Sequence, residues 1–297
     1  MNAALEFLPQ FSRSVQSTVA AAKPSVVAVR NADRQYISGL VWAPDVVVTS
    51  EQAMGSREQY ELVREGVAVK ARILARDPGT NILVLRSEQP IETKERVVGV
   101  AQVGAFVLAL GANVEGALTV RAGLVNTVGA QWYSRAGGRI DQRIALDIRL
   151  HRTEEGGPVL DAEGALIGMS TQGVAGQVLV IPTATLERVV PELVRDGRVA
   201  RGWLGLALHP VAVPHALRDV AGHTTGMMVM SIANDSPGAK AGLAPGDILL
   251  TIDDAPARMR SMAALLDASS IGRQVKLRVI RGGEVMSLET VIAARPT

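Results

Sequence analysis

The sequence has 297 residues, of which 47% are hydrophobic and 3% aromatic, so it can form two globular domains with mainly aliphatic cores. Its 31 basic and 29 acidic residues are interspersed and leave a net charge of +2, which argues against nucleic acid as the main ligand. The chain has no cysteine, which excludes disulfides, thiol catalysis and cysteine-based metal sites, and we expect no cofactor.

After an N-terminal segment with helical character at 1–22, short apolar or alternating runs are separated by Gly, Pro, Asp and Asn. Such runs are typical of β-strands separated by turns. The predicted strands are 25–30, 37–43, 46–49, 67–75, 82–86, 106–110, 118–128, 144–150, 166–170 and 178–181. This series predicts an all-β barrel or sandwich.

The hydrophobic period changes to that of a helix between Thr183 and Asp196. Pro191 lies inside this segment and should kink the helix or cost about 3 kcal/mol, and Gly197 is placed to cap its C-terminal end. We expect this helix to close a first domain at 23–197, with a linker at 198–202.

From Trp203 to the C-terminus, strands alternate with two short helical stretches. The predicted strands are 204–208, 227–232, 248–252, 275–280 and 288–293, and the predicted helical stretches are 236–242 and 261–268. Residues 203–297 therefore read as a small, separate α+β domain.

The sequence contains no segment with the pattern of a secretory leader or a membrane-spanning helix. Residues 1–20 lack the basic start and the roughly 7–15 apolar residues of a secretory leader. The longest apolar run, Val103–Ala112, is shorter than the roughly 20 residues that a membrane-spanning helix needs. We expect no transmembrane segment, and with no visible leader a cytoplasmic location stays open.

Three segments resemble trypsin-like serine proteases of the HtrA/Deg type in order and spacing. They are SGLVWAPDVVVTSEQAM (38–54), RDPGTNILVL (76–85) and RTEEGGPVLDAEGALIGMST (152–171). Further along, SIANDSPGAKAGLAPGDILLTIDDAPA (231–257) and VKLRVIRGGE (275–284) resemble a PDZ domain. The resemblance implies a mainly β chain, with a chymotrypsin-like double β-barrel followed by a small α+β PDZ domain.

The resemblance also places a catalytic triad in the chain, in the order histidine, aspartate, serine. These positions fall on Gln52, Asn81 and Glu155. An amide accepts no proton at ordinary pH, asparagine has no charge to orient a base, and glutamate has no hydroxyl to attack a carbonyl. The resemblance therefore implies a degenerate protease domain. One engineered mutation or one misaligned residue would account for a single altered position, but not for three independent ones.

The loop before Glu155 is altered as well. The family forms its oxyanion hole from the backbone N–H groups of the nucleophile and of a glycine two positions before it, which is Thr153 here. A β-branched residue resists conformations that glycine enters freely, so we expect no open hole, and the Glu155 carboxylate itself is a candidate to fill it. His151 reads as an ordinary loop histidine, and Glu51 and Glu154 as solvated side chains rather than metal ligands.

The PDZ resemblance implies a groove in which a peptide adds as a strand to a sheet edge, with its carboxylate held by backbone N–H groups. Its positions fall on a carboxylate-binding loop, a neighbouring strand and a groove helix, with core packing as the alternative for each. They are Trp203, Leu204, Gly205, Leu206, Met228, Val229, Met262 and Leu265.

The leading hypothesis is a catalytically inactive HtrA-like protein that binds peptides or unfolded C-termini, as a scaffold, adaptor or chaperone-like factor in protein quality control. One alternative is an endopeptidase that uses non-standard residues. Another is a regulatory subunit in a homotrimer or a mixed oligomer with active relatives, for which Phe7 and Phe11 match aromatic contact positions. The resemblance also implies a periplasmic or envelope location.

Overall fold

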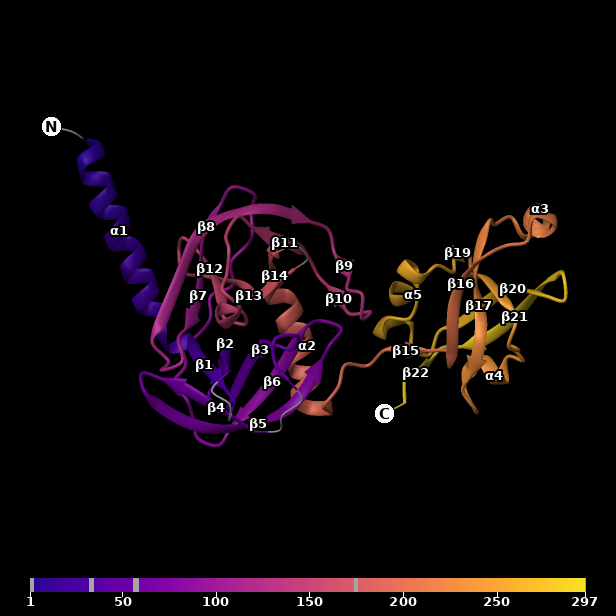
Figure 1. Cartoon of the computed structure of the whole chain (residues 1–297), viewed down its shortest axis with the longest axis horizontal. Helices are drawn as coiled ribbons and strands as arrows, with labels where there is room; N and C mark the ends of the chain where they lie inside the picture. Colours follow the sequence, from indigo (N-terminus) through magenta and orange to yellow (C-terminus); the bar gives the residue numbers. More distant parts are fainter. Residues whose placement is uncertain (1–2, 32–34, 56–58, 174–175, 297) are drawn as a thin grey trace. The chain divides into compact units, whose positions relative to one another are not determined.

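The computed structural model describes residues 3–31, 35–55, 59–173 and 176–296. Contacts between Cα atoms divide the chain into two compact units, residues 1–136 with 140–198 and residues 199–297 with 137–139. Figure 1 shows the course of the chain through both units.

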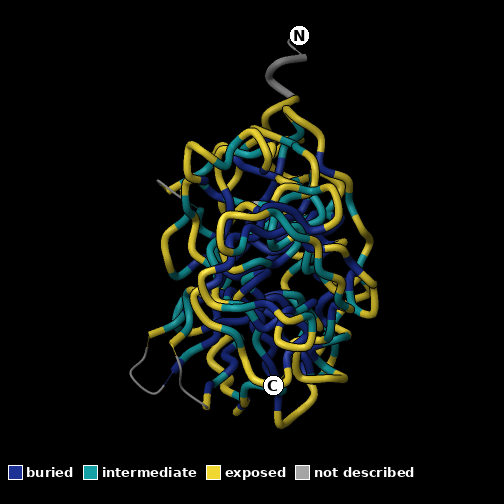
Figure 2. Tube along the Cα trace, turned by 90° about the vertical axis from the view of Figure 1, so that its right-hand side faces the viewer, coloured by how far each residue is buried: buried dark blue, intermediate teal, exposed yellow. Residues whose placement is uncertain are grey.

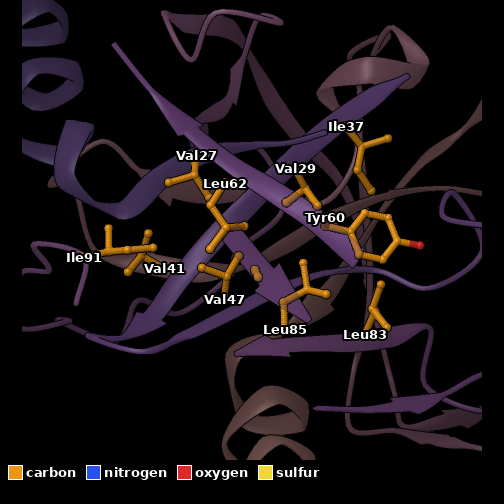
Figure 3. Close-up of a cluster of buried hydrophobic side chains, with 11 residues drawn as sticks. Val27, Val29, Ile37, Val41, Val47, Tyr60, Leu62, Leu83, Leu85 and Ile91 are labelled. Atoms are coloured by element: carbon orange, nitrogen blue, oxygen red, sulfur yellow. The ribbon is translucent and has the colours of Figure 1, made fainter. Parts of the chain in front are cut away.

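The first unit begins with helix α1 (Ala3–Ala22) and a 3-10 turn at Lys23–Ser25, followed by a closed six-stranded barrel. Its strands lie in the order β1-β2-β3-β6-β5-β4. They are β1 (Val26–Arg30), β2 (Tyr36–Ala43), β3 (Val46–Ser50), β4 (Gln59–Arg64), β5 (Val67–Asp77) and β6 (Ile82–Ser87). Valine-rich segments such as VVAVR in β1 suit a pleated, buried surface, and Figure 3 shows their side chains meeting around Leu62 and Tyr60.

A second closed barrel follows, with its strands in the order β11-β14-β13-β12-β7-β8. They are β7 (Phe106–Ala112), β8 (Leu118–Gly129), β11 (Arg143–Leu146), β12 (Pro158–Asp161), β13 (Leu166–Gln172) and β14 (Val178–Pro182). Between β8 and β11, the short strands β9 (Trp132–Tyr133) and β10 (Arg139–Ile140) pair with each other. A 3-10 turn at Arg152–Glu154 precedes β12.

Helix α2 (Thr183–Asp196) closes the first unit with the bounds that the helical period predicts. Gly197 has a φ of 71°, and its N–H donates to the Leu193 carbonyl, so it is the expected C-terminal cap. Pro191 lies on the exposed side of the helix, which continues for five more residues to Asp196.

The second unit contains a five-strand path in the order β16-β17-β18-β20-β21, with β19 paired to β18 and a separate β15–β22 pair. The strands are β15 (Gly202–Trp203), β16 (Leu206–Ala212), β17 (Thr225–Ile232), β18 (Ile248–Ile252), β19 (Ala255–Pro256), β20 (Gln274–Arg281), β21 (Glu284–Val291) and β22 (Ala293–Ala294). The helices are α3 (Arg218–Ala221), α4 (Pro237–Lys240) and α5 (Met259–Leu265), with 3-10 turns at His215–Leu217 and Ala268–Ser270.

A buried carboxylate fixes the turn before β18. Both oxygens of Asp247 accept hydrogen bonds from Arg281, at 2.8 and 2.7 Å, and Oδ2 also accepts from the Ala244 N–H at 2.8 Å. Burial alone would raise the pKa of Asp247, but these hydrogen bonds outweigh it and lower the pKa below its usual range. The charged form of Asp247 therefore stabilises this unit.

The expected mainly β architecture, two barrels followed by an α+β unit, is confirmed. The structure adds β4 and β12, which the sequence did not reveal, and ends the strand predicted at 144–150 at Leu146. Most of the buried hydrophobic residues belong to strands, and Figure 2 marks the buried stretches of the trace in dark blue. Among the described residues, no helix is both long and apolar enough to cross a membrane.

Candidate functional site

The three triad positions lie together where the two barrels of the first unit meet. Gln52 follows β3 and Asn81 precedes β6 in the first barrel, whereas Glu155 precedes β12 in the second. The Gln52 Nε2 donates to Glu155 Oε1 at 2.7 Å, and the Gln52 backbone N–H donates to Asn81 Oδ1 at 2.7 Å. The three residues predicted at the triad positions therefore occupy one site and are joined by hydrogen bonds.

The Glu155 carboxylate accepts a set of neutral donors. Besides Gln52, its Oε1 accepts from the hydroxyls of Ser50, at 2.7 Å, and Thr171, at 2.8 Å. Glu155 is only 2% exposed. Charge-assisted hydrogen bonds of this kind are stronger than neutral ones, so the carboxylate holds residues of both barrels in place.

Asn81 strengthens the same junction from the other side. It has a φ of 58°, a left-handed conformation that asparagine tolerates better than most residues. Its Nδ2 donates to Thr171 Oγ1 at 2.7 Å and to Ser50 Oγ at 3.0 Å. The amide thus bridges the barrels at the position where the family keeps a charged carboxylate.

The two hydroxyls of this network were absent from the sequence-based prediction. Ser50 lies two residues before Gln52 and is fully buried, and Thr171, on β13, is 4% exposed. Both lie within the segments that resemble the family, 38–54 and 152–171, and this was the available signal. Both are buried, and their hydroxyls donate to Glu155.

The backbone N–H groups of the oxyanion loop are engaged within the loop itself. The Thr153 N–H donates to His151 Nδ1, and the Glu155 N–H donates to the Arg152 carbonyl, both at 3.4 Å. Thr153 lies inside the 3-10 turn that begins after His151, and its hydroxyl contacts the His151 ring at 2.8 Å. The Glu155 carboxylate contacts the Gln52 side rather than these N–H groups. The loop is therefore closed by its own hydrogen bonds.

The two flanking glutamates differ from the expectation of solvated side chains. Glu154 is 7% exposed, and both of its oxygens accept from Arg121 Nε at 3.0 Å. Glu51 is partly buried and pairs with Arg76 at 3.5 Å. The prediction was wrong for Glu154 because its partner lies 33 residues away on β8. Within the described part of the chain, no group of acidic or histidine side chains could hold a metal.

A cleft lies beside two of the three predicted triad positions. Its cavity has a volume of about 510 Å³, and Gln52 and Asn81 are among the residues that line it. Trp132, Ile140 and Leu179 contribute apolar surface to its wall. The cleft can therefore admit a small apolar group beside Gln52 and Asn81.

In the second unit, the loop between β15 and β16 turns its carbonyl groups inward. The Leu204 carbonyl accepts from the Gly238 N–H, and the Gly205 carbonyl accepts from the Ala233 N–H, both at 2.8 Å. In trans peptides the N–H points opposite to the carbonyl, so the N–H groups of Gly205 and Leu206 point away from these partners. Two adjacent N–H groups pointing outward form a site that can hold a carboxylate.

Glycine is required in this loop. Gly205 has a φ of 76°, and a Cβ at this position would lie 2.1 Å from the Ser236 Cβ. Leu204 is buried in the core of the unit, whereas Trp203 and Leu206 are partly exposed.

The other predicted peptide-binding residues fall on three different elements. Met262 and Leu265 lie on α5 and pack, partly buried, against the same core cluster as Leu206. Met228 and Val229 lie on β17, which is enclosed between β16 and β18, and Val229 is buried. The strand that offers a free edge next to the loop is β16, of which the predicted peptide-binding residues included only Leu206.

Comparisons with known proteins agree with this architecture. The family model described as a trypsin-like peptidase domain matches residues 37–169, and the one described as a PDZ domain matches residues 204–292. A probable periplasmic serine endoprotease, DegP-like, from Brucella suis biovar 1 (strain 1330) is 30% identical over 275 residues, covering 87% of this chain and 52% of the relative. A protein of the same description from Rhizobium meliloti (strain 1021) is 26% identical over 266 residues, covering 84% and 51%.

Solved structures with the same fold cover almost the whole chain. The HtrA-type protease AlgW with a tripeptide is 26% identical, with a TM-score of 0.67, and the match covers 94% of this chain and 97% of that one. The serine endoprotease from Yersinia pestis is 24% identical, with a TM-score of 0.69 and coverages of 95% and 98%, and shares the fold. The chain spans about half the length of the curated relatives it matches. With both domain matches in the same order, two barrels and an α+β unit, the chain belongs to the HtrA/Deg-type family of trypsin-like proteases with a PDZ domain.

Proposed function

We propose that this chain is a catalytically inactive HtrA/Deg-type protein that binds peptides, including unfolded C-termini, through its PDZ domain. The observation that carries this proposal is the hydrogen bond from Gln52 to the buried carboxylate of Glu155, at 2.7 Å. It joins an amide in the base position to a carboxylate in the nucleophile position. The amide of Gln52 cannot take up the proton at ordinary pH, and Glu155 has no hydroxyl with which to form the acyl-enzyme through which this family cleaves peptides.

The closed oxyanion loop supports the same proposal independently. A transition-state oxyanion needs N–H donors that are free and aimed at one point, and removal of a single donor costs about 10²–10³ in rate. Here the Thr153 and Glu155 N–H groups are engaged by His151 and Arg152. Two separate requirements of the reaction are therefore unmet.

The PDZ domain supports the binding role. Its loop points two N–H groups outward beside the free edge of β16, and Leu206, Met262 and Leu265 provide an apolar surface at one end. A carboxylate with an apolar side chain next to it suits these features. We also propose a periplasmic or envelope location, which the description of one relative as a probable periplasmic endoprotease supports.

A second candidate function is that of a subunit associated with active relatives. Phe7 and Leu8 are 62% and 67% exposed, and the Phe11 ring contacts Phe106 edge-on with 5.3 Å between ring centroids. Exposed apolar groups gathered on one element favour a protein contact. Co-purification of the tagged chain with an active homologue would support this role, and a purely monomeric chain would not.

The activity test uses the full chain, with trypsin as the positive control. We expect no hydrolysis of casein and no covalent labelling by a fluorophosphonate probe, which reacts with activated serine hydroxyls. Labelling of the chain, or casein hydrolysis that co-elutes with it and disappears in Glu155→Ala, would favour an endopeptidase with non-standard residues. The binding test is fluorescence anisotropy with labelled peptides that carry either a free or an amidated C-terminus.

A further inference from the structure

Strand β16 forms one edge of its sheet, the left edge of that sheet in Figure 1, and pairs with β17 on its other side. If the proposed function holds, a bound peptide would extend the sheet along this edge. The backbone groups that point outward along the edge then determine how much of the peptide is recognised. The hydrogen bonds of β17 establish which groups these are.

The hydrogen bonds of Val229 show which residues of β17 direct their backbone groups toward β18 and which toward β16. Its N–H donates to the Asp247 carbonyl and its carbonyl accepts from the Gly246 N–H, both at 2.8 Å, so both of its backbone groups face β18. Backbone groups alternate in direction along a strand, and those of Met228 therefore face β16. Met228 lies opposite His209, which must direct its own N–H and carbonyl toward β17.

The residues on either side of His209 accordingly face the free edge. Leu208 presents an N–H and a carbonyl there. Pro210 presents a carbonyl only, because its ring replaces the N–H. Proline is found within sheets at edge positions where the missing N–H would have faced outward, and Pro210 fits this placement. At the other end, the Gly205 carbonyl faces Ala233, so Leu206 also directs its groups to the free edge.

We propose that Pro210 sets the length of peptide that this domain recognises. A peptide antiparallel to β16, with its carboxylate at the Gly205 and Leu206 N–H groups, has its last residue opposite Leu206. Its third-last residue lies opposite Leu208 and exchanges two hydrogen bonds with it. Its fifth-last residue lies opposite Pro210 and can donate one hydrogen bond but receives none. The two-way ladder therefore ends before the fifth-last residue.

The partner is thus a protein or peptide with a short free C-terminal tail, of which about four residues contribute full backbone recognition. Leu206 and Leu208, which are partly buried against the same cluster as Met262 and Leu265, provide the apolar side of the groove. The competing explanation is that Pro210 only prevents the edge of β16 from pairing with other chains, which is a common role of proline on edge strands.

The first experiment needs no variant of the protein. The probe is a fluorescein-labelled heptapeptide of alanines ending in Val-Leu, with a free carboxyl group, and its binding to the full chain is measured by anisotropy. In a second version of this peptide, an ester replaces the amide bond that contains the carbonyl of the third-last residue. An ester carbonyl is a weaker acceptor, so its hydrogen bond from the Leu208 N–H is weakened, and we expect a loss of affinity of about two- to tenfold. The same change at the fifth-last carbonyl should leave the affinity unchanged.

The second experiment gives β16 the missing donor. In Pro210→Ala we expect the heptapeptide to bind about two- to tenfold more tightly. A peptide of only its last four residues should bind as it does to the wild type. The heptapeptide with the ester at its fifth-last carbonyl should not show the gain. Pro214→Ala is the matched control, since it makes the same chemical change four residues later, just after β16.

The outcomes are distinguishable. Equal losses from both esters in the wild-type chain would overturn the role of Pro210 while leaving the proposed peptide binding intact. Self-association of Pro210→Ala without the gain for the heptapeptide would favour edge protection and would also overturn it. Binding of no peptide, free or amidated, would refute the proposed function and this inference together.

Discussion

Replacing Glu155 by alanine should destabilise the first unit by about 3 kcal/mol. The carboxylate accepts three hydrogen bonds within 2.8 Å, from Ser50, Gln52 and Thr171, and hydrogen bonds to charged groups contribute about 1.5–3 kcal/mol each. Burial of one charge opposes this with a penalty of several kcal/mol. The difference, about 3 kcal/mol, is the stability that Glu155→Ala should remove.

Urea unfolding followed by tryptophan fluorescence measures this loss. Trp42 and Trp132 report on the first unit, so Trp203→Phe in every variant removes the signal of the second. With a slope of about 3 kcal/mol per M, the unfolding midpoint should fall by about 1 M. Glu163→Ala, which removes an exposed glutamate of the same unit, should leave the midpoint unchanged. An unchanged or higher midpoint in Glu155→Ala would refute the reasoning, because it would mean that the buried carboxylate is unfavourable overall.

Three further results are expected. Restoring histidine, aspartate and serine at the three triad positions should give no measurable casein hydrolysis while Thr153 remains, and any recovery should require Thr153→Gly as well. Gly205→Ala should abolish peptide binding in the anisotropy assay, because its Cβ meets Ser236, whereas Gly242→Ala, with the same φ of 76° but open space around it, should retain binding. Asp247→Asn should lower the free energy of unfolding of the second unit by about 2 kcal/mol at neutral pH, measured by urea titration with the fluorescence of Trp203. The pKa of Asp247 is lowered in the folded state, so its contribution to stability is complete above its usual pKa of about 3.9. This contribution is lost as the pH falls through the lowered pKa. The unfolding free energies of Asp247→Asn and of the wild type should therefore converge in acid.

The strands that the sequence revealed are those with strong local patterns. Valine-rich β1 and β3 and the helical period of α2 carry their structure in consecutive residues. Strand β4 is a short alternation of polar and apolar residues, and β12 has four residues after a Gly-Gly-Pro turn. Neither is distinct from a loop until its neighbours in the barrel are known, because pairing rather than propensity makes them strands.

In the candidate site, too, the features set by local sequence were predictable and those set by contacts between distant segments were not. Aligned motifs were enough to name Gln52, Asn81 and Glu155, and the structure places them together. The donors that surround Glu155 depend on the approach of the second barrel, since Thr171 comes from β13. The engagement of the Thr153 N–H by His151 depends on the shape of a single 3-10 turn. The free edge of β16 likewise follows from strand order, although a proline within a strand was a signal for it.

The network around Glu155 also constrains how this chain could change over time. Serine at 155 alone would deprive the hydroxyls of Ser50 and Thr171 of their shared acceptor. Aspartate at 81 alone would place a second carboxylate beside the same two hydroxyls, where like charges repel. Each single step toward a protease therefore lowers stability before it can restore chemistry. Under the proposed function, the hydrogen bonds between the two barrels therefore make the residues at 52, 81 and 155 hard to exchange one at a time, because a return to the family's residues would need several substitutions at once.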